Sequence, residues 1–362
     1  MRQKTISQKE IAEQLGVSVA TVSRVFNDQP GVSPELRGKV LDLMGQTNYS
    51  PNMMARSLAT AMTHTAAFVT HKFDDGAVDD PFYPLILAGA ESYLSQYNYH
   101  ILLTALEHEA MARPQTFSAI RQRRVDGLIL AGPDIATSFI LHMLASNIPV
   151  VLVDNSLSQA AVNCIVSDDC GGAYAAACHL IEHGHKRIVC LSGPEEWIST
   201  RERIRGYTRA MTRIGLEPAI VHAYDTTIAT GTTMMREALE KWPDLTAVCA
   251  VNDAIAIGAI RAVRKVGRRV PEDVAIMGFD DISWAVINDP PLSTVHVYKR
   301  RMGQLAGQCL LDAIQDAAAA PIKTIVSTTL VIRQSCGCPE PSGGSQPPAG
   351  LERSDGSAGI RR

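Results

Sequence analysis

Three polar side chains, Asp154, Asn252 and Asp280, each stand where an apolar stretch of the sequence gives way to a loop. A fourth, Arg203, lies in the segment RERIRGY (201–207), a predicted helix that follows a Ser-Gly-Pro turn. In doubly wound α/β folds, ligands bind at the carboxyl ends of the strands, so these four groups are candidates for ligand contact. Carboxylates, an amide and a planar guanidinium can together accept from and donate to adjacent hydroxyls. The pattern favours a sugar over hydride or phosphate chemistry, although the same residues could instead cap loops or pair with one another.

Enzymatic chemistry has weaker support in the sequence. Asp280 and Asp281 are neighbours at a strand end, where successive side chains point in opposite directions, so they cannot act on one substrate bond. Gly171-Gly172 precedes a helix without the Walker lysine or the dinucleotide glycine spacing, and no Gly-x-Ser-x-Gly elbow is present. We expect no catalytic residue and no cofactor. The alternative function is a sugar- or nucleoside-processing enzyme with an appended helical module.

Histidine and cysteine gather at Cys178, His179, His183 and His185, which suggests a metal cluster. No Glu completes a zincin motif, and the last two histidines straddle a predicted helix C-terminus, where His favours the helix dipole. We therefore predict no metal site.

The eight cysteines are scattered, mostly inside apolar runs, where a free thiol behaves as a small buried hydrophobe. Cys336 and Cys338 are the one close couple, with no second pair or His nearby in the sequence to complete a tetrahedral zinc site. We expect reduced cysteines and a surface thiol pair near the end of the chain.

The elements that must position these groups are apolar runs alternating with amphipathic helical segments. Runs that are apolar throughout predict parallel strands buried on both faces, with helices between them at 85–97, 172–183 and 254–266. The number of units exceeds one sheet of usual size, so the predicted fold class is α/β, with two doubly wound lobes and a cleft between them. The predicted strands are 66–70, 101–104, 127–131, 150–154, 188–191, 247–251 and 275–279.

The N-terminal region carries three helical patterns instead. The first stops at Gly16, Ser18 caps a second over 19–26, and a third covers 34–46. A tight glycine turn between two short helices is typical of a helix-turn-helix. In the second helix the apolar face leaves Ala20 and Arg24 on the opposite side, where small apolar groups can contact thymine methyls and Arg can pair with guanine or phosphate. A three-helix interaction module without a DNA role remains the alternative.

Composition limits the possible functions. The chain has 362 residues, 46% of them hydrophobic, and a formal net charge of −3, so it can form more than one core and any DNA contact must be local. No secretory signal or membrane-spanning segment is visible in the sequence, so we expect no membrane partner and a cytoplasmic protein.

A longer composite motif makes the DNA-binding interpretation specific. The run VSVATVSRVFN (17–27), followed by Val32-Ser33, YSPN (49–52) and ARSL (55–58), resembles the DNA-binding domain and hinge of the lactose and galactose repressor family. The resemblance implies a sequence-specific transcriptional regulator, with repression as the expected mode. We assign DNA contact to Ser18, Val19, Ala20, Thr21, Arg24, Asn27 and Leu58.

The hinge segment also has its own physical interpretation. Ser50 can cap a helix, Pro51 suits its first position, and the helix would have barely two turns, so it is marginal alone. In the family such a helix orders against the partner subunit's copy and the DNA minor groove. Leu58 matches the family's leucine wedge, which pries apart a central base step.

The resemblance continues to about Gln334 through motifs such as VDGLIL (125–130), AVND (250–253) and GFDD (278–281). It implies the fold of periplasmic sugar-binding proteins, with two lobes joined by three crossovers. Positions matching Arg203, Asn252 and Asp280 contact effectors in the family, Asp154 is a weaker match, and an aromatic pair floors the pocket. The expected effector-binding residues are Phe82, Tyr83, Asp154, Trp197, Arg203, Thr226, Asn252 and Asp280.

The expected organisation is a helix-turn-helix domain (1–49), a hinge helix and linker (50–63), a two-lobed effector-binding and dimerisation domain (64–335), and a disordered tail (336–362). Two recognition helices must span two half-sites, so the expected partners are a near-palindromic double-stranded operator, a small carbohydrate effector and a second copy of the chain.

Overall fold

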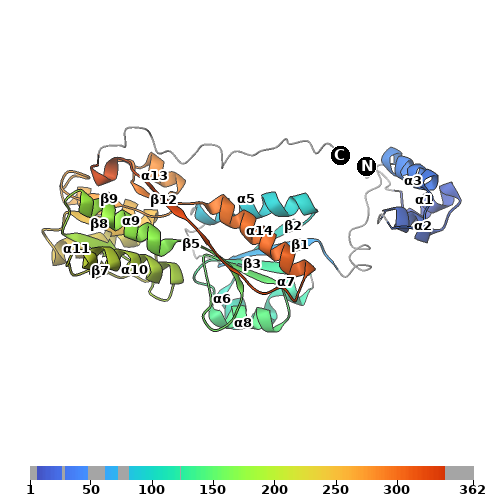
Figure 1. Cartoon of the computed structure of the whole chain (residues 1–362), viewed down its shortest axis with the longest axis horizontal. Coiled ribbons are helices and arrows are strands. Elements are labelled where there is room, and N and C mark those ends of the chain that lie inside the picture. The colour runs from blue at the N-terminus through green and yellow to red at the C-terminus, as the bar shows by residue number, and fades with distance from the viewer. Residues whose placement is uncertain (1–5, 27–28, 48–61, 72–80, 123, 339–362) are drawn as a thin grey trace. The chain divides into compact units, whose positions relative to one another are not determined.

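The computed structural model describes residues 6–26, 29–47, 62–71, 81–122 and 124–338. The chain divides into two units, Met1–Thr63 and His64–Arg362, each of which is treated by itself below (Figure 1). The predicted hinge helix with Leu58, and also Asn27, lie outside the described residues.

The N-terminal unit consists of α1 (Gln8–Leu15), α2 (Val19–Phe26) and α3 (Pro34–Gln46), at the predicted positions. Gly16 ends α1 in a left-handed conformation, φ 65°, which a residue without a Cβ adopts at little cost. Ser33 caps α3, and Pro34 takes the first helical position. Ile11, Val22 and Val40, one from each helix, are fully buried and form the centre of a small core.

The first lobe of the body is built on a six-stranded parallel sheet in the order β11-β5-β4-β3-β1-β2. Helices α5 (Phe82–Leu94), α8 (Thr137–Ala145) and α14 (Lys299–Gln315) accompany it, with the shorter α6 (His108–Ala112) and α7 (Ser118–Arg121) (Figure 1). The strands are β1 (Thr65–His71), β2 (His100–Leu106), β3 (Gly127–Ala131), β4 (Val150–Val153), β5 (Asn163–Ser167) and β11 (Lys323–Val326).

The second lobe has a four-stranded parallel sheet in the order β7-β6-β8-β9. Its strands are β6 (Ile188–Leu191), β7 (Ala219–Val221), β8 (Ala247–Ala250) and β9 (Ala275–Met277), and its helices are α9 (Asp169–Glu182), α10 (Ile198–Arg213), α11 (Ile228–Lys241), α12 (Asp253–Lys265) and α13 (Ser283–Ile287). The two-lobed α/β body agrees with the predicted fold class.

Three crossovers join the lobes, as the family resemblance implies. The first leads from β5 into α9, the second from β10 (Thr294–Val297) into α14, and the third from β11 through β12 (Thr328–Val331) to the short 3-10 helix η4 (Gln334–Cys336). Strands β10 and β12 pair antiparallel, so the second and third crossovers lie side by side (Figure 1).

Close helix contacts depend on glycine in the first lobe. A side chain at Gly303 of α14 would overlap the carbonyl oxygen of Ile86 in α5, and one at Gly89 would overlap the carbonyl oxygen of Arg300. The two helices therefore approach backbone to backbone, which fixes where the second crossover enters the first lobe.

Two expectations from the sequence are wrong. Strand β2 is an edge strand, not one buried on both faces, and Leu103 within it is 58% exposed. Cys336 and Cys338 are not a surface pair, since they are only 2% and 8% exposed, and the body continues to Cys338. Apolar composition identifies a strand but not its place in the sheet. The Pro- and Gly-rich sequence after Cys338 suggested an exposed tail and gave no sign that the two thiols are buried.

Candidate functional site

Arg203, on the second turn of α10, is the centre of a buried ionic cluster. Its Nε donates to Asp169 Oδ1 at 2.8 Å, its Nη1 donates to the Val251 carbonyl at 2.6 Å, and its Nη2 lies 3.1 Å from Asp280 Oδ1. The side chain is only 9% exposed. Its planar fork is thus held by groups from three separate segments.

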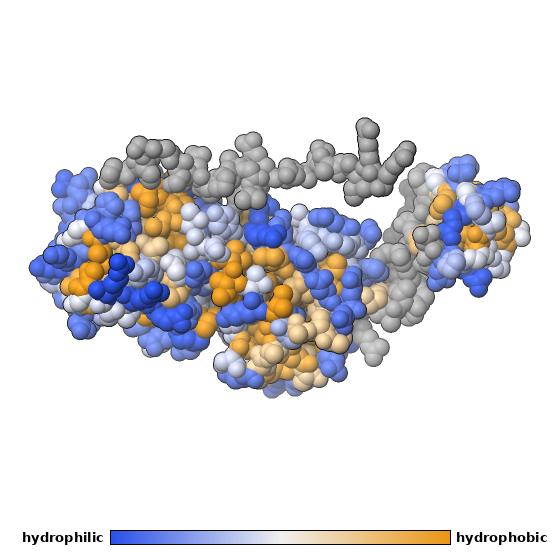
Figure 2. Space-filling model, viewed as in Figure 1, coloured by the Kyte–Doolittle hydropathy of each residue, from blue (hydrophilic) through white to orange (hydrophobic). Residues whose placement is uncertain are grey.

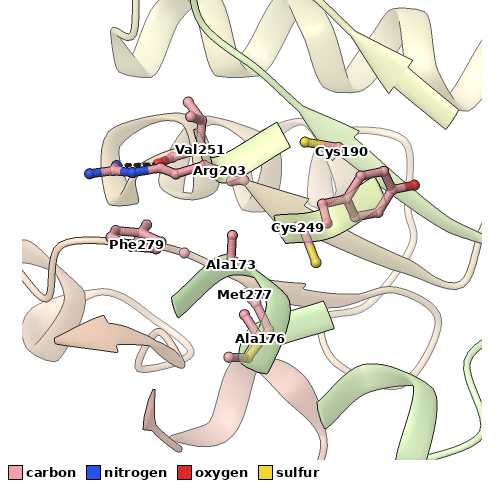
Figure 3. A pocket seen from close by; sticks show the side chains of 11 residues that line it. Ala173, Ala176, Cys190, Arg203, Cys249, Val251, Met277 and Phe279 are labelled. Atoms are coloured by element: carbon pink, nitrogen blue, oxygen red, sulfur yellow. Dashed lines mark hydrogen bonds between the residues drawn. The ribbon is translucent and has the colours of Figure 1, made fainter. Parts of the chain in front are cut away.

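The strand ends bring those groups together. Val251 directly follows β8, Asp280 follows β9 with φ 102°, and Asp169 begins α9 at the first crossover. The guanidinium carbon of Arg203 lies 3.8 Å from the centroid of the Phe279 ring, and Figure 3 shows the two side chains facing each other. Stacking on an aromatic face adds a cation–π attraction that orients the guanidinium plane.

Asp154 extends the cluster into the other lobe. It follows β4 in a left-handed conformation, φ 57°, and accepts a hydrogen bond from the Tyr83 hydroxyl at 3.1 Å. Burial, followed by the negative charge of Asp169, raises the pKa of Asp154 well above its ordinary value, against the opposing effect of Arg203. Burial also raises the pKa of Asp169, again opposed by Arg203. Three carboxyl groups from two lobes therefore share one guanidinium.

A small pocket lies next to the guanidinium inside the second lobe (Figure 3). Its walls come from α9, α10 and the strand ends, and Arg203 is the one charged side chain among the described residues that form them. The lining residues are Ala173, Ala176, Cys190, Arg203, Tyr207, Cys249, Ala250, Val251, Met277, Gly278 and Phe279. The ionic cluster is thus backed by apolar walls.

Asn252 and Thr226 lie beside each other at the strand ends, but local structure already engages the Asn252 amide. Its Oδ1 accepts from the Ile255 N–H at 2.9 Å and caps α12, while its Nδ2 donates to the Thr226 carbonyl at 3.3 Å. Both residues are half-buried, as is Trp197, which stands at the N-cap of α10. Asn252 thus caps helix α12, and its contact with the effector stays a prediction.

Phe82 and Tyr83, the aromatic pair at the start of α5, have different neighbours. Phe82 and Tyr83 meet edge to face with ring centroids 5.1 Å apart, and Phe82 is 4% exposed. The Tyr83 hydroxyl reaches Asp154, whereas the Lys299 ammonium lies 5.9 Å from the Phe82 centroid. Tyr83 thereby links α5 to the ionic cluster.

Asp281 faces away from Asp280, as the sequence predicts for neighbours at a strand end. Its carboxylate lies 2.8 Å from His296 Nδ1 and accepts from Arg333 Nη2 at 2.7 Å. Burial alone would raise the pKa of Asp281, but the bonds to His296 and Arg333 outweigh it, and the pKa is lowered. Asp281 therefore fastens the second and third crossovers together.

Sequence reasoning missed Asp169 and Lys299. The predicted helix began at 172, three residues late, which hid an acidic residue at the first position of α9. Lys299 is 1% exposed and donates from Nζ to the carbonyls of Asp281 and Val297 at 3.2 and 3.0 Å. A Lys is rarely so buried unless its ammonium is fully partnered. The Asp281 carbonyl is brought to Lys299 only by the folded chain, so the local sequence did not indicate a buried position.

The face of α2 predicted to enter the major groove is exposed. Val19 is 44% exposed, and Ala20 and Arg24 are also exposed, while Val22 and Val25 are buried. Figure 2 shows hydrophobic side chains beside hydrophilic ones on the visible face of this unit.

The two hydroxyl residues of this face are partly engaged. The Ser18 Oγ accepts from the Thr21 N–H at 3.1 Å and lies 2.9 Å from the Thr21 hydroxyl. Ser18 thus caps the helix as expected while remaining exposed.

Comparison with known proteins identifies both units. Residues 7–52 match the model of bacterial regulatory proteins of the lacI family, and residues 72–334 match that of periplasmic binding proteins and the sugar binding domain of the LacI family. The chain belongs to the LacI family. It is therefore a DNA-binding transcriptional regulator with an effector-binding body. In the described part of the chain, no helix is both long and apolar enough to cross a membrane.

Named LacI-family relatives are similar over nearly the whole chain. The transcriptional regulator CelR of Thermobifida fusca is 32% identical, over 92% of this chain and 99% of its own. The repressor PurR of Photobacterium profundum is 31% identical, over 90% of this chain and 97% of its own.

Solved structures of the LacI family share the fold. The lac repressor dimer bound to operator and the anti-inducer ONPF has a TM-score of 0.79 at 29% identity, covering 92% of this chain and 99% of that one. A CelR–cellobiose complex has a TM-score of 0.69 at 30% identity, covering 91% of this chain and 99% of that one.

Two buried aspartates, Asp154 in the cluster and Asp281 outside it, should respond oppositely to neutralisation. The pKa of Asp154 is higher in the folded than in the unfolded state, so ionisation of this carboxyl destabilises the fold at any pH above the unfolded-state pKa. Asp154→Asn removes that charge and should raise the Tm at pH 7 by a few degrees. The gain should vanish as the pH falls below that unfolded pKa, where both side chains are neutral. Thermal unfolding of the ligand-free protein from pH 7 downward measures this.

Asp281→Asn is the matched control with the opposite sign. The pKa of Asp281 is lower in the folded than in the unfolded state, so its ionised carboxylate stabilises the fold at any pH above the unfolded-state pKa. That stabilisation is lost as the pH falls through the folded-state pKa. Breaking its pair with Arg333 and His296 should cost about 3–5 kcal/mol at pH 7. A Tm that falls equally in both variants would contradict the charge assignment.

Proposed function

We propose that this regulator is a homodimeric repressor whose operator affinity is set by a sugar bound between its two lobes at the Arg203 cluster. The observation that carries the proposal is that acidic groups of both lobes converge on one guanidinium: Asp169 and Asp280 on one side, Asp154 with Tyr83 on the other. A ligand that bonds to both sets is sensitive to how far the lobes are closed.

The chemistry of the cluster suits a polyhydroxylated ligand. Carboxylates accept from hydroxyls and the guanidinium donates to them, so a sugar can hydrogen-bond to the cluster while Arg203 stays paired with its carboxylates. The Phe279 ring, which stacks on the Arg203 guanidinium, holds the guanidinium plane in position for such a ligand. The CelR relative has been solved with cellobiose, and another relative is named as a ribose operon repressor, at 30% identity in Haemophilus influenzae.

On the DNA side, α2 would enter the major groove with Val19 and Ala20 against base edges and Arg24 on guanine or phosphate. One such helix reads one half-site, so a second copy of the chain is required for a near-palindromic operator. The lac repressor neighbour is a dimer on its operator. Leu58, outside the described residues, would wedge the central base step in the minor groove. Since its proposed target is operator DNA, we propose that the protein acts in the cytoplasm.

Coupling between the sites is limited by the ligand's preference for one lobe arrangement over the other. The enzyme alternative differs in its outcome, because an enzyme releases a changed product while a sensor returns its ligand unchanged. In the described residues, the carboxyl groups that converge here face Arg203 or Tyr83, an arrangement that favours binding over acid–base turnover.

A ligand screen tests this proposal directly. Monosaccharides, disaccharides and purines are added separately to the full-length protein, and the Tm is recorded. A true effector should raise the Tm in a concentration-dependent way, since it binds the folded state, and should be recovered unchanged after incubation. Conversion of the ligand to a product would support the enzyme alternative instead.

Paired variants test the division of labour. Arg24→Ala should weaken operator binding by about 1–3 kcal/mol and leave ligand affinity unchanged. Arg203→Lys keeps the charge but loses the fork, and it should weaken ligand binding roughly 10- to 100-fold while sparing operator binding without ligand. Band shifts and calorimetry measure the two affinities.

Two exposed basic residues provide matched controls. Lys39 on α3 pairs with Glu35, and Arg205, two residues after Arg203, pairs with Glu202. Lys39→Ala and Arg205→Ala should change either affinity only a few-fold. Loss of both activities in folded Arg24→Ala and Arg203→Lys dimers would contradict the proposal, and Leu58→Ala should behave like Arg24→Ala.

A further inference from the structure

A second cluster of chemically active groups lies in the second lobe, apart from the ionic cluster. His179, in the last turns of α9, meets Cys336 and Cys338 at the end of the third crossover. One ring nitrogen and the two sulfur atoms all lie within 4.8 Å of one another. The fold thus joins residues that are far apart in the sequence.

The segment that carries the two cysteines is firmly anchored. Ser335, which directly precedes Cys336, is fully buried. Its Oγ donates to the Ile276 carbonyl at 2.6 Å and accepts from the Ser293 N–H at 2.8 Å. Gly337 then adopts φ 70°, and the Cys338 thiol returns to the Cys336 carbonyl at 3.5 Å. This left-handed turn keeps the two sulfurs close.

The spacing fits a tetrahedral metal ion. Zinc–sulfur bonds of about 2.3 Å and zinc–nitrogen bonds of about 2.1 Å at tetrahedral angles place the two sulfurs about 3.8 Å apart and each sulfur about 3.6 Å from the nitrogen. From separations within 4.8 Å, the three ligand atoms need to contract by at most about 1.2 Å. His179 Nε2 is buried and has no hydrogen-bond partner among the described residues. A buried ring nitrogen without a partner costs free energy that a metal bond would recover.

The three other candidate ligands of the histidine-rich segment have other partners, although the His183 ring centroid lies 4.4 Å from that of His179. His183 Nδ1 is bonded to the His179 carbonyl at 2.8 Å, His185 Nδ1 lies 3.1 Å from the Thr246 hydroxyl, and the Cys178 thiol faces Arg213. The cluster suggested by the sequence, Cys178 to His185, therefore does not assemble, and only His179 joins the distant thiols.

We propose that His179, Cys336 and Cys338 form a binding site for a thiophilic divalent metal, zinc above all, with a water molecule or other small ligand in the fourth position. Thiolate and imidazole are the ligands zinc prefers in proteins. Two thiolates and one Zn²⁺ have no net charge, so the bound site can lie in a buried place without an unpaired charge.

Binding of a metal requires the two thiols to lose their protons. Burial, then the charge of His183, lowers the pKa of His179. Burial and the hydrogen bond to Cys336 raise the pKa of Cys338 to about 12. Thiols held protonated are poor redox nucleophiles, whereas a metal displaces their protons on binding.

A metal here would fasten the end of the third crossover to α9. That helix begins at Asp169 beside Arg203 and reaches His179 ten residues later, about 15 Å along its axis. The site would stabilise the second lobe by mass action, without contact to the ionic cluster.

Cobalt provides the direct test. Reduced, chelator-treated, full-length protein is titrated with Co²⁺, followed by Zn²⁺. We expect one Co²⁺ per chain, a sulfur-to-cobalt charge-transfer band, its loss when Zn²⁺ displaces Co²⁺, and a higher Tm with Zn²⁺. Cys336→Ser and Cys338→Ser should each abolish the band. His179→Gln removes a direct ligand, so it should lower the affinity for Co²⁺ by more than the roughly 10- to 100-fold that is typical of losing a residue hydrogen-bonded to a metal ligand.

Cys178→Ser and His183→Gln are the matched controls on the same helix, and both should keep the band and the zinc-dependent rise in Tm. Circular dichroism confirms that each variant is folded. A titration without a sulfur-to-cobalt band, or a band that survives both serine variants, would overturn the assignment. The assignment would also be overturned if Cys336 and Cys338 were found in a disulfide and the reduced protein bound no metal.

Discussion

The buried guanidinium of Arg203 is the interaction on which the body depends. A charge so far from water must be balanced by opposite charge and hydrogen bonds, and the balance here comes from the start of α9, the carbonyl after β8 and the carboxylate after β9. Asp154 brings a third carboxyl from the other lobe, which leaves the cluster with more acid than base. Burial, followed by the negative charge of Asp169, raises the pKa of Asp154. The ligand-free cluster is therefore held together but not fully satisfied, which is the state in which a ligand rich in hydroxyls has most to contribute.

The crossovers convert that local chemistry into lobe geometry. Asp280 pairs with Arg203, whereas Asp281 pairs with Arg333 and His296, so two neighbouring residues connect the cluster to the second and third crossovers. Lys299 reinforces the same turn from the first residue of α14 by donating to the Asp281 carbonyl. A change in the cluster therefore acts directly on the strands that join the lobes.

Local patterns in the sequence predicted the helix-turn-helix, because its caps and glycine turn act over three or four residues. They also predicted that Asp154, Asn252, Asp280 and Arg203 gather at the cleft, because ligand-binding residues follow the carboxyl ends of parallel strands, and Arg203 does pair with Asp280. They could not reveal Asp169, hidden by a helix start placed too late, nor the buried Lys299, whose partners come from other segments. The contact of His179 with Cys336 and Cys338 depends on the third crossover returning to α9, which no local pattern encodes. Local sequence thus determines the elements, while long-range returns of the chain complete the sites.

The central claim is that ligand occupancy of the Arg203 cluster and operator binding are two expressions of one equilibrium between lobe arrangements. Thermodynamic linkage makes the coupling reciprocal, so the factor by which saturating ligand changes operator affinity must equal the factor by which operator changes ligand affinity. Measuring both affinities on the same preparation at one salt concentration tests this most directly. Equal factors, both different from one, are predicted; a ligand that binds the cluster and leaves operator affinity unchanged would contradict the account.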